Sequence, residues 1–348
     1  MKINRPKKIL VIRNDKIGDF MLSWPAFSLL KKQYPDAEIT ALVPGYTADL
    51  AEQCAWIDKI LIDKKQSQPL NDIYQLASTI KSSRFDLSIS LFSETRTSAA
   101  LWLARVKTRI GPATKIAQVF LNKRLKQKRS RSTKPEYEYN LDLVRYFIKL
   151  CGDTPVEAQQ PPLLAFDHSE LQQLKHNFYQ QHAIEQNSKL VLIHPGTGGS
   201  AINLSIEQYA GLARSISAVS DVHIVITAGP GELSIANKLS GLMKDSRHHV
   251  HSSDSGIIEF CKFIGIADVF ISGSTGPLHI AGALNINTAA FYPARRSATA
   301  LRWQTINSPQ RRLCFSPEKF TGENDMMQID IKKSANAIVD SFLSRAGD

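Results

Sequence analysis

The chain has 348 residues, of which 43% are hydrophobic and 22% are charged. This composition is typical of a soluble globular protein, and the length favours two domains over one. No apolar run approaches the roughly 20 residues that a membrane-spanning helix needs. The first apolar run ends at Arg13, too early for the core of a signal peptide. We therefore expect a cytoplasmic protein.

The cysteine and histidine patterns argue against two common kinds of site. The four cysteines form no CxxC pair and are widely scattered, at Cys54, Cys151, Cys261 and Cys314. Neither a disulfide framework nor a zinc ribbon is indicated, so we expect all four to be reduced and buried. His248, His249 and His251 cluster without HExxH or Cys/His spacing. A solvent-facing or core role is favoured for them over metal binding.

The formal net charge of +11 is concentrated in one segment. Arg105 to Lys134 contains eleven basic residues and no acid, so the rest of the chain is neutral on balance. Such a segment suits nucleic acid, an anionic membrane face, or a phosphorylated or acidic acceptor. It also suits a mobile, solvated loop that only aids solubility. The densest part, 122–134, has no aromatic side chain to stack on a base, which disfavours nucleic acid.

The first half of the chain alternates short apolar runs with helical patterns. This rhythm predicts a parallel sheet covered by helices on both faces. The predicted strands are Lys8–Arg13, Glu38–Val43, Lys59–Asp63 and Asp86–Phe92, and the predicted helices are Asp19–Gln33, Thr47–Gln53, Leu70–Ser82, Thr95–Ala104 and Tyr137–Leu150.

A Pro- and Gln-rich stretch, Gly152–Pro162, predicts a linker, after which the same rhythm restarts. An irregular stretch containing Pro and Arg precedes the last predicted helix. The predicted strands are Leu190–His194, His223–Thr227, His249–Ser252, Val269–Ser272 and Thr288–Tyr292, and the predicted helices are Ser169–Ile184, Ser205–Ala218, Glu232–Met243, Ile257–Ile266, Pro277–Leu284 and Ile331–Leu343.

These patterns predict an α/β protein with two doubly wound, Rossmann-like domains. We expect the first domain over residues 1–155, the second over 156–330, and a C-terminal helix within 331–348. Ligands of such sheets bind beyond the carboxyl ends of the strands, so a cleft between two facing sheets is expected.

The loop after the first strand runs from Arg13 to Asp19. It has one glycine where a dinucleotide fingerprint needs three, which disfavours a nicotinamide or flavin cofactor. Asp19 follows Gly18 at the start of a predicted helix. It is either a first-turn acid favoured by the helix dipole or a general base that takes a proton from an incoming hydroxyl. Arg13 and Lys16 are expected to keep it ionised.

Two loops of the second half suit a nucleotide diphosphate. The loop His194–Ser200 follows a strand and offers many N–H donors with little steric bulk, although it lacks the GK[ST] ending of a P-loop. A second loop of this kind is Thr227–Glu232. Glu232 either accepts hydrogen bonds from ribose or base groups or is a helix-start acid.

A third loop resembles a phosphate cradle. Ser274, Thr275 and Gly276 stand between a strand and a helix, whose free backbone N–H groups and dipole suit an anion. Pro277 fits the first helical turn. Glycine and serine also occur at such turns for steric reasons alone. His279 lies one turn into this helix, where it either donates to a phosphate or sugar oxygen or packs in the core.

Several motifs together are specific. They are Ile9–Arg13 with Gly18-Asp19 and Trp24-Pro25-Ala26, Arg109-Ile110-Gly111, Glu138–Leu143, His194-Pro195-Gly196, Gly229–Glu232 and Ser274–Ala281. With them, the chain resembles the bacterial lipopolysaccharide heptosyltransferases, glycosyltransferase family 9, along nearly its full length. The resemblance implies a GT-B architecture without metal or cofactor. The first domain would bind the acceptor, and the second an activated sugar, usually ADP-heptose.

The resemblance also implies roles for individual residues. Asp19 looks like the catalytic base of an inverting transfer, and backbone N–H groups would stabilise the leaving ADP. The acceptor would be the phosphorylated lipopolysaccharide core, so the basic segment predicts peripheral association with the inner face of the inner membrane. The implied donor-binding residues are Thr197, Gly198, Glu232, Ser274, Thr275, Gly276 and His279, and the implied acceptor-binding residues are Arg13, Lys16 and Arg96.

The chain departs from the family pattern at two places. Many members have a basic residue and Trp before Pro in the loop after His-Pro-Gly, whereas this chain has Ala201–Ser205. Many members also carry Asp where this chain has Ser274. Two alternatives therefore stay open. One is a family 9 enzyme with a different nucleotide sugar or surface-glycan acceptor, and the other is a catalytically weak nucleotide-sugar-binding protein on the same fold.

Overall fold

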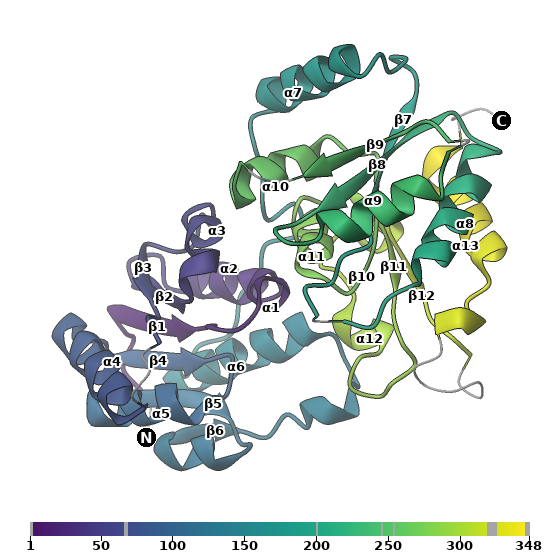
Figure 1. Cartoon of the computed structure of the whole chain (residues 1–348). Helices are drawn as coiled ribbons and strands as arrows, with labels where there is room; N and C mark the ends of the chain where they lie inside the picture. The colour runs from purple at the N-terminus through teal and green to yellow at the C-terminus, as the bar shows by residue number, and fades with distance from the viewer. Residues whose placement is uncertain are drawn as a thin grey trace. The chain divides into compact units, whose positions relative to one another are not determined.

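The computed structural model describes residues 3–65, 69–199, 201–244, 246–252, 255–318 and 326–344. The chain forms two compact units, each built around one sheet (Figure 1). The first unit contains residues 1–129 and 134–160, and the second contains 130–133 and 161–348. Within the described residues, no helix is long and apolar enough to cross a membrane.

The first unit contains a six-stranded sheet in the order β3-β2-β1-β4-β5-β6, and all of its strand pairs are parallel. Its central strand is covered on both faces, because Ile9 to Ile12 have no exposed surface. The strands are β1 (Lys8–Ile12), β2 (Glu38–Val43), β3 (Lys59–Ile62), β4 (Leu87–Ser90), β5 (Thr108–Pro112) and β6 (Lys123–Leu125).

In the first unit, α4 packs against α5, and α2 packs against α6. Leu76, Ile80 and Leu101, from α4 and α5, form a core with side chains of β1 and β2. The helices are α1 (Ile17–Met21), α2 (Trp24–Gln33), α3 (Ala48–Glu52), α4 (Pro69–Ser83), α5 (Thr95–Leu103) and α6 (Glu136–Cys151), with the 3-10 helix η1 at Gly45–Thr47.

The predicted helix Asp19–Gln33 is in fact two helices. The chain leaves α1 at Leu22 and restarts α2 at Trp24, with Pro25 in the first turn. A proline inside a continuous helix would lose a hydrogen bond and clash with the preceding turn, whereas in a first turn its missing N–H costs nothing. The break leaves Asp19 on a helix of five residues.

The basic segment is ordered, so the alternative of a mobile loop is wrong for most of it. It forms β5, the 3-10 helix η2 (Ile116–Phe120), β6 and the 3-10 helix η3 (Arg129–Arg131). The strands β5 and β6 were not predicted. In the case of β6, the strand has only three residues and two of them are basic. The Arg109 side chain holds the segment together, since its Nε donates to the Phe120 carbonyl at 2.7 Å.

The second unit also contains six parallel strands, in the order β12-β11-β10-β7-β8-β9. In both units, the first strand in the chain (β1 or β7) lies between the second and the fourth. The chain therefore builds the sheet outward in one direction for its first three strands and in the opposite direction for the next three. Such switch points are where open α/β sheets bind ligands. The strands are β7 (Lys189–His194), β8 (Val222–Ala228), β9 (His248–Ser252), β10 (Val269–Gly273), β11 (Asn287–Phe291) and β12 (Arg312–Phe315).

The C-terminal helix belongs to the core of the second unit. It packs along α8 (Figure 1), and Ala335 and Ile338 join the cluster formed by β7, β8 and α8. The helices are α7 (His168–Gln181), α8 (Ile206–Ser217), α9 (Leu233–Gly241), α10 (Ile257–Gly265), α11 (Gly276–Ala283), α12 (Ala300–Trp303), α13 (Ile331–Ile338) with the π-helical turn η6 (Val339–Leu343), and the 3-10 helices η4 (Pro309–Arg311) and η5 (Met326–Gln328).

Two predictions about the rest of the chain need correction. The stretch before the last helix is not wholly irregular, because it contains α12 and β12. Cys54, Cys151 and Cys261 are buried, but Cys314 is exposed. Cys314 lies on β12, an edge strand, where one side of the strand has no neighbour. All four thiols are free.

Candidate active site

The loop after β1 brings a buried arginine against three acids. Arg13 is 2% exposed. Its Nε lies 2.8 Å from Asp15 Oδ1, its Nη2 contacts Asp19 Oδ1, and its Nη1 lies 3.5 Å from Glu136 Oε1. The same Nη1 donates to Asn140 Oδ1 at 3.2 Å. Arg13 therefore fixes the carboxyl groups at the carboxyl end of β1, and it does not project into solvent.

Burial changes the proton affinity of two of these acids. Burial raises the pKa of Asp15 to about 7. The nearby Arg13 cation opposes this rise, and repulsion by the Asp19 carboxylate adds to it. Burial also raises the pKa of Asp19. The attraction of the Arg13 cation lowers this pKa by less than burial raises it, and repulsion by the Glu136 carboxylate raises it further. Arg13 and Lys16 do favour the ionised form of Asp19, as expected, but the effect of burial on the pKa is larger. A carboxyl group whose pKa lies closer to neutrality is a stronger base.

The other two acceptor-site candidates differ in exposure. Lys16 is exposed at the start of α1, so its charge is open to an anionic ligand. Arg96 is largely enclosed, with its side chain 13% exposed. It contacts Asp63 and lies 3.2 Å from Asp72 and 3.7 Å from Glu94. These acids hold Arg96 at the ends of β3 and β4.

In the second unit, Glu232 joins the loops after β7 and β8. Its Oε2 lies 3.3 Å from His194 Nε2 and accepts from the Gly229 N–H at 3.1 Å. Its Oε1 accepts from the Gly198 N–H at 2.8 Å. The His194 contact, despite partial burial, lowers the pKa of Glu232 to about 2. His194 is itself oriented by Thr227, whose Oγ1 lies 3.0 Å from Nδ1.

The cradle after β10 has the geometry of a helix N-terminus. Thr275 is the N-cap of α11, and Pro277 lies in the first turn. The Thr275 hydroxyl lies 3.0 Å from the Ser272 hydroxyl, which in turn donates to the His194 carbonyl at 3.0 Å. The Thr275 side chain therefore faces the protein, and the backbone N–H groups of the first turn are the donors left for an anion.

His279 is buried at 2% exposure, and its Nδ1 has no hydrogen-bond partner among the described residues. Burial lowers its pKa to about 4, so the ring is neutral at physiological pH. A buried polar atom without a partner is costly. A ligand hydroxyl or phosphate oxygen bound to this atom would remove that cost.

Comparisons with known proteins identify the family. The sequence model of glycosyltransferase family 9 (heptosyltransferase) matches residues 73–319. A Haemophilus influenzae protein, named as a glycosyltransferase without a stated sugar, is 42% identical over 97% of this chain and 96% of its own length. The chain belongs to glycosyltransferase family 9.

Two solved structures share the fold of this glycosyltransferase. The family 9 glycosyltransferase from Veillonella parvula has a TM-score of 0.80 and 16% identity, covering 98% of each chain. The ADP-heptose lipopolysaccharide heptosyltransferase II of E. coli has a TM-score of 0.75 and 16% identity, covering 96% of this chain and 98% of its own. The predicted α/β class of the GT-B type is confirmed.

The glycosyltransferase has site residues that sequence reasoning did not single out. Asp15, Glu136 and Asn140 all contact the Arg13 guanidinium. Glu136 is 2% exposed and also lies 2.7 Å from Arg129 Nη1. A signal for this was the acid-rich start of α6 directly after the basic segment, because buried acids require nearby cations.

Asn203 lies in the loop after β7, in the part of the glycosyltransferase for which the sequence predicts the donor site. Its Nδ2 donates to the Pro195 carbonyl at 3.1 Å, and its Oδ1 accepts from the Tyr209 hydroxyl at 2.5 Å. A Cβ on Gly273 would lie 2.6 Å from that Oδ1. Asn203 therefore ties the loop after β7 to the end of β10 and leaves no charge there.

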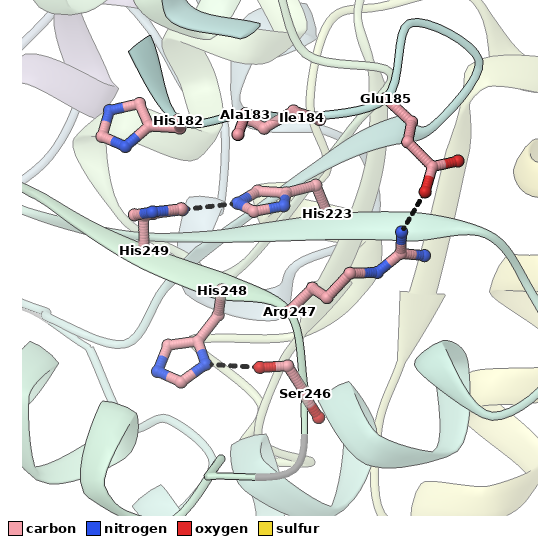
Figure 2. A pocket seen from close by; sticks show the side chains of 9 residues that line it. All are labelled: His182, Ala183, Ile184, Glu185, His223, Ser246, Arg247, His248 and His249. Atoms are coloured by element: carbon pink, nitrogen blue, oxygen red, sulfur yellow. Dashed lines mark hydrogen bonds and ion pairs between the residues drawn. The ribbon is translucent and has the colours of Figure 1, made fainter. Parts of the chain in front are cut away.

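A cavity of about 380 Å³ lies at the amino ends of the strands in the sheet of the second unit. Figure 2 shows His182, His223, His248 and His249 around it, at the amino ends of β8 and β9. His223 Nε2 and His249 Nδ1 are 2.6 Å apart. The loops 194–200 and 228–232 follow the carboxyl ends of β7 and β8, so the cavity is separate from them.

Replacing Gly196 with Ala is expected to lower the free energy of unfolding by about 1–3 kcal/mol, the cost of breaking hydrogen bonds to a charged group. The added Cβ would lie 2.2 Å from the Glu232 carboxyl group, so Glu232 must leave His194 and the two glycine N–H groups. Urea denaturation measures the change. Gly241→Ala is the control, because a Cβ there meets no atom within 4 Å. Equal stability of the two variants would contradict the role of Glu232 as a link between loops.

Proposed function

We propose that this glycosyltransferase moves a heptose from ADP-heptose to the inner core of lipopolysaccharide, with inversion at the anomeric carbon and without a metal. Asp19 is the general base of the proposed reaction. The observation that carries this proposal is the placement of Asp19 at the carboxyl end of β1, against a buried arginine and with a raised pKa.

In the proposed reaction, an ionised Asp19 removes the proton of an acceptor hydroxyl. The hydroxyl oxygen forms a bond to the anomeric carbon of the donor sugar while the bond to the diphosphate oxygen breaks. ADP leaves as the anion, and Asp19 holds the proton. Such base catalysis contributes about 10²–10⁴ to the rate. A single displacement of this kind inverts the configuration at the attacked carbon.

The proposed donor site stabilises the leaving group through backbone dipoles. The loops 194–205, 228–232 and 273–279 contain no Lys or Arg, so the diphosphate would bind to backbone N–H groups of Thr197, Gly198 and the Ser274–Gly276 turn. The Gly198 N–H, which donates to Glu232 in the absence of ligand, would then be shared between Glu232 and the diphosphate. His279 would donate to a sugar or phosphate oxygen through its buried ring. Glu232 would accept from ribose, because each of its oxygens has further acceptor capacity.

The proposed donor, ADP-heptose, and the proposed acceptor, lipopolysaccharide, are those in the name of the E. coli enzyme with the same fold. The acceptor core is phosphorylated and attached to lipid A, and the basic segment of this chain offers a complementary charge. Lys16 would contact the acceptor directly, whereas Arg13 and Arg96 would hold the acids around it. We propose that the enzyme works in the cytoplasm at the inner face of the inner membrane.

Thermal-shift measurements with ADP, UDP, GDP and their sugar conjugates test the donor. ADP and ADP-heptose are expected to raise the melting temperature, by an amount that grows with concentration as mass action requires. A shift with UDP or GDP and none with ADP would refute the ADP-heptose assignment and favour another nucleotide sugar. The absence of a cation from the donor loops is the observation that makes this alternative worth testing.

A further inference from the structure

Three apolar side chains of the first unit are exposed on α5 and η2, which pack against each other. Trp102, at the end of α5, is 53% exposed, and Ile116 and Val119, on η2, are 71% and 69% exposed. Residues three apart in a 3-10 helix share one face, so Ile116 and Val119 project together. The Trp102 ring lies 6.1 Å from the Phe120 ring at the end of the same helix. We call Trp102, Ile116 and Val119 the apolar patch.

The 3-10 helix η2, which carries Ile116 and Val119, is firmly anchored. Ala117 and Leu121 are buried at 0% and 4% exposure. Leu121 fits over Gly111, where a Cβ would lie 2.7 Å from its Cδ1. The Asn122 side chain accepts from the Arg109 N–H and donates to the Lys107 carbonyl, both at 2.8 Å. The protein therefore holds these apolar side chains outward, and they do not turn into the core.

Basic residues surround the patch in the chain. Arg105 and Lys107 follow Trp102, Lys115 precedes Ile116, and β6 begins at Lys123 on the edge of the sheet (Figure 1). Arg105, Lys107 and Lys115 are exposed. Among the described residues, no carboxylate forms an ion pair with any of these four side chains. Their positive charge therefore faces solvent without compensation.

We propose that the apolar patch and its basic rim dock the enzyme on an anionic phospholipid surface. Tryptophan prefers the level of the headgroups, and the aliphatic side chains reach into the acyl boundary. The surrounding cations attract anionic lipid, each contributing about fivefold in affinity. Nucleic acid fits this surface less well, because two of the three apolar side chains are aliphatic and cannot stack on bases. The inference deepens the membrane association proposed above and rests on it.

Vesicle sedimentation tests the docking surface in the full-length enzyme. Wild type is expected to sediment with vesicles of phosphatidylglycerol and phosphatidylethanolamine and to stay in solution with phosphatidylcholine alone. The variant Trp102→Ser/Ile116→Ser/Val119→Ser should bind the anionic vesicles about tenfold more weakly or worse, since the buried apolar area is lost. Lys115→Gln/Lys123→Gln should weaken binding about 25-fold, and added salt should weaken wild type in the same direction.

The matched control is Val219→Ser/Leu233→Ser, which removes two apolar side chains of 63% and 46% exposure from the second unit. This variant should sediment like wild type. Quenching of Trp102 fluorescence by brominated lipid, absent in Trp102→Phe, would place the ring in the bilayer interface. Equal sedimentation of wild type and the patch variant would overturn the proposal. Stronger binding to a single-stranded oligonucleotide than to vesicles would do the same.

The thermal shift with ADP separates this proposal from the proposed function. A patch variant that loses vesicle binding should keep the ADP shift of wild type, because the patch and the donor loops belong to different units. A protein that binds vesicles through the patch but shows no ADP shift would refute only the donor assignment.

Discussion

Asp19→Asn is expected to lower the rate of sugar transfer by about 10²–10⁴-fold, the range that a general base contributes. The amide keeps the shape of the side chain but cannot take a proton. Nucleotide binding should stay as in wild type, because Asp19 lies in the first unit and the proposed donor loops lie in the second. Turnover with saturating donor and acceptor measures the first effect, and the ADP thermal shift measures the second.

The pH dependence of transfer gives a second readout for Asp19. Its pKa is raised by burial, so the ascending limb of the rate profile should lie above the ordinary range of an aspartate. Transfer should fall as pH decreases through this limb, since only the ionised base accepts a proton. In Asp19→Asn the limb should disappear. A profile that persists unchanged would assign the limb to another acid, with Asp15 the first candidate.

Asp49→Asn is the matched control. Asp49 is also an acid in the first turn of a five-residue helix, but it is exposed. If Asp19 only complemented the helix dipole, both variants would lose a few tenths of a kcal/mol of stability and keep their activity. Unchanged turnover in Asp19→Asn would therefore end its assignment as the base.

Arg13→Met is expected to lower the free energy of unfolding of the first unit by about 3–5 kcal/mol, as the loss of one partner in a buried ion pair does. Methionine fills much of the space but leaves Asp15, Asp19 and Glu136 without their shared cation. Urea denaturation followed by circular dichroism measures the loss. Arg5→Met is the control, because Arg5 pairs with Asp153 at an exposed surface and its loss should leave the midpoint nearly unchanged.

The sign of the pH effect in Arg13→Met follows from the acids. Without the guanidinium, the pKa values of Asp15 and Asp19 in the folded state rise further above those of the unfolded chain. The unfolded chain then ionises while the folded protein stays protonated, which penalises folding above the unfolded pKa of about 4. The difference in the free energy of unfolding between variant and wild type should therefore be largest at neutral pH and should decrease toward pH 4. A difference in the free energy of unfolding that does not change with pH would mean that Arg13 acts through packing alone.

The sequence predicts the parts of the fold that local patterns encode. The buried strands β1, β2, β7 and β8 are rich in Ile, Leu and Val, so their positions follow largely from local composition. The edge strands β6 and β12 carry basic and polar residues and could not be distinguished from loops. Edge strands need less burial, so their sequence carries a weaker signal.

The candidate site was predictable where it depends on strand ends and not where it depends on distant partners. Asp19 and Glu232 stand where the loops after β1 and β8 enter a helix, and both were singled out. Asn140 contacts Arg13 across a separation of 127 residues, and no local pattern indicates such a pair. The raised pKa of Asp19 comes first from burial in the folded unit, and Glu136, another distant residue, adds to it.

The contacts of Glu232 also bear on the thermodynamics of nucleotide binding. Three donors from two segments, the end of β7 with its loop and the loop after β8, already fix its carboxylate in the absence of ligand. The side chain thus loses its rotational freedom during folding, and a nucleotide that uses it meets a preorganised acceptor. This lowers the entropic cost of binding by about 0.5–1.5 kcal/mol relative to a freely rotating glutamate. Calorimetry of ADP binding should accordingly show a smaller unfavourable entropy in wild type than in Gly196→Ala, in which Glu232 is released.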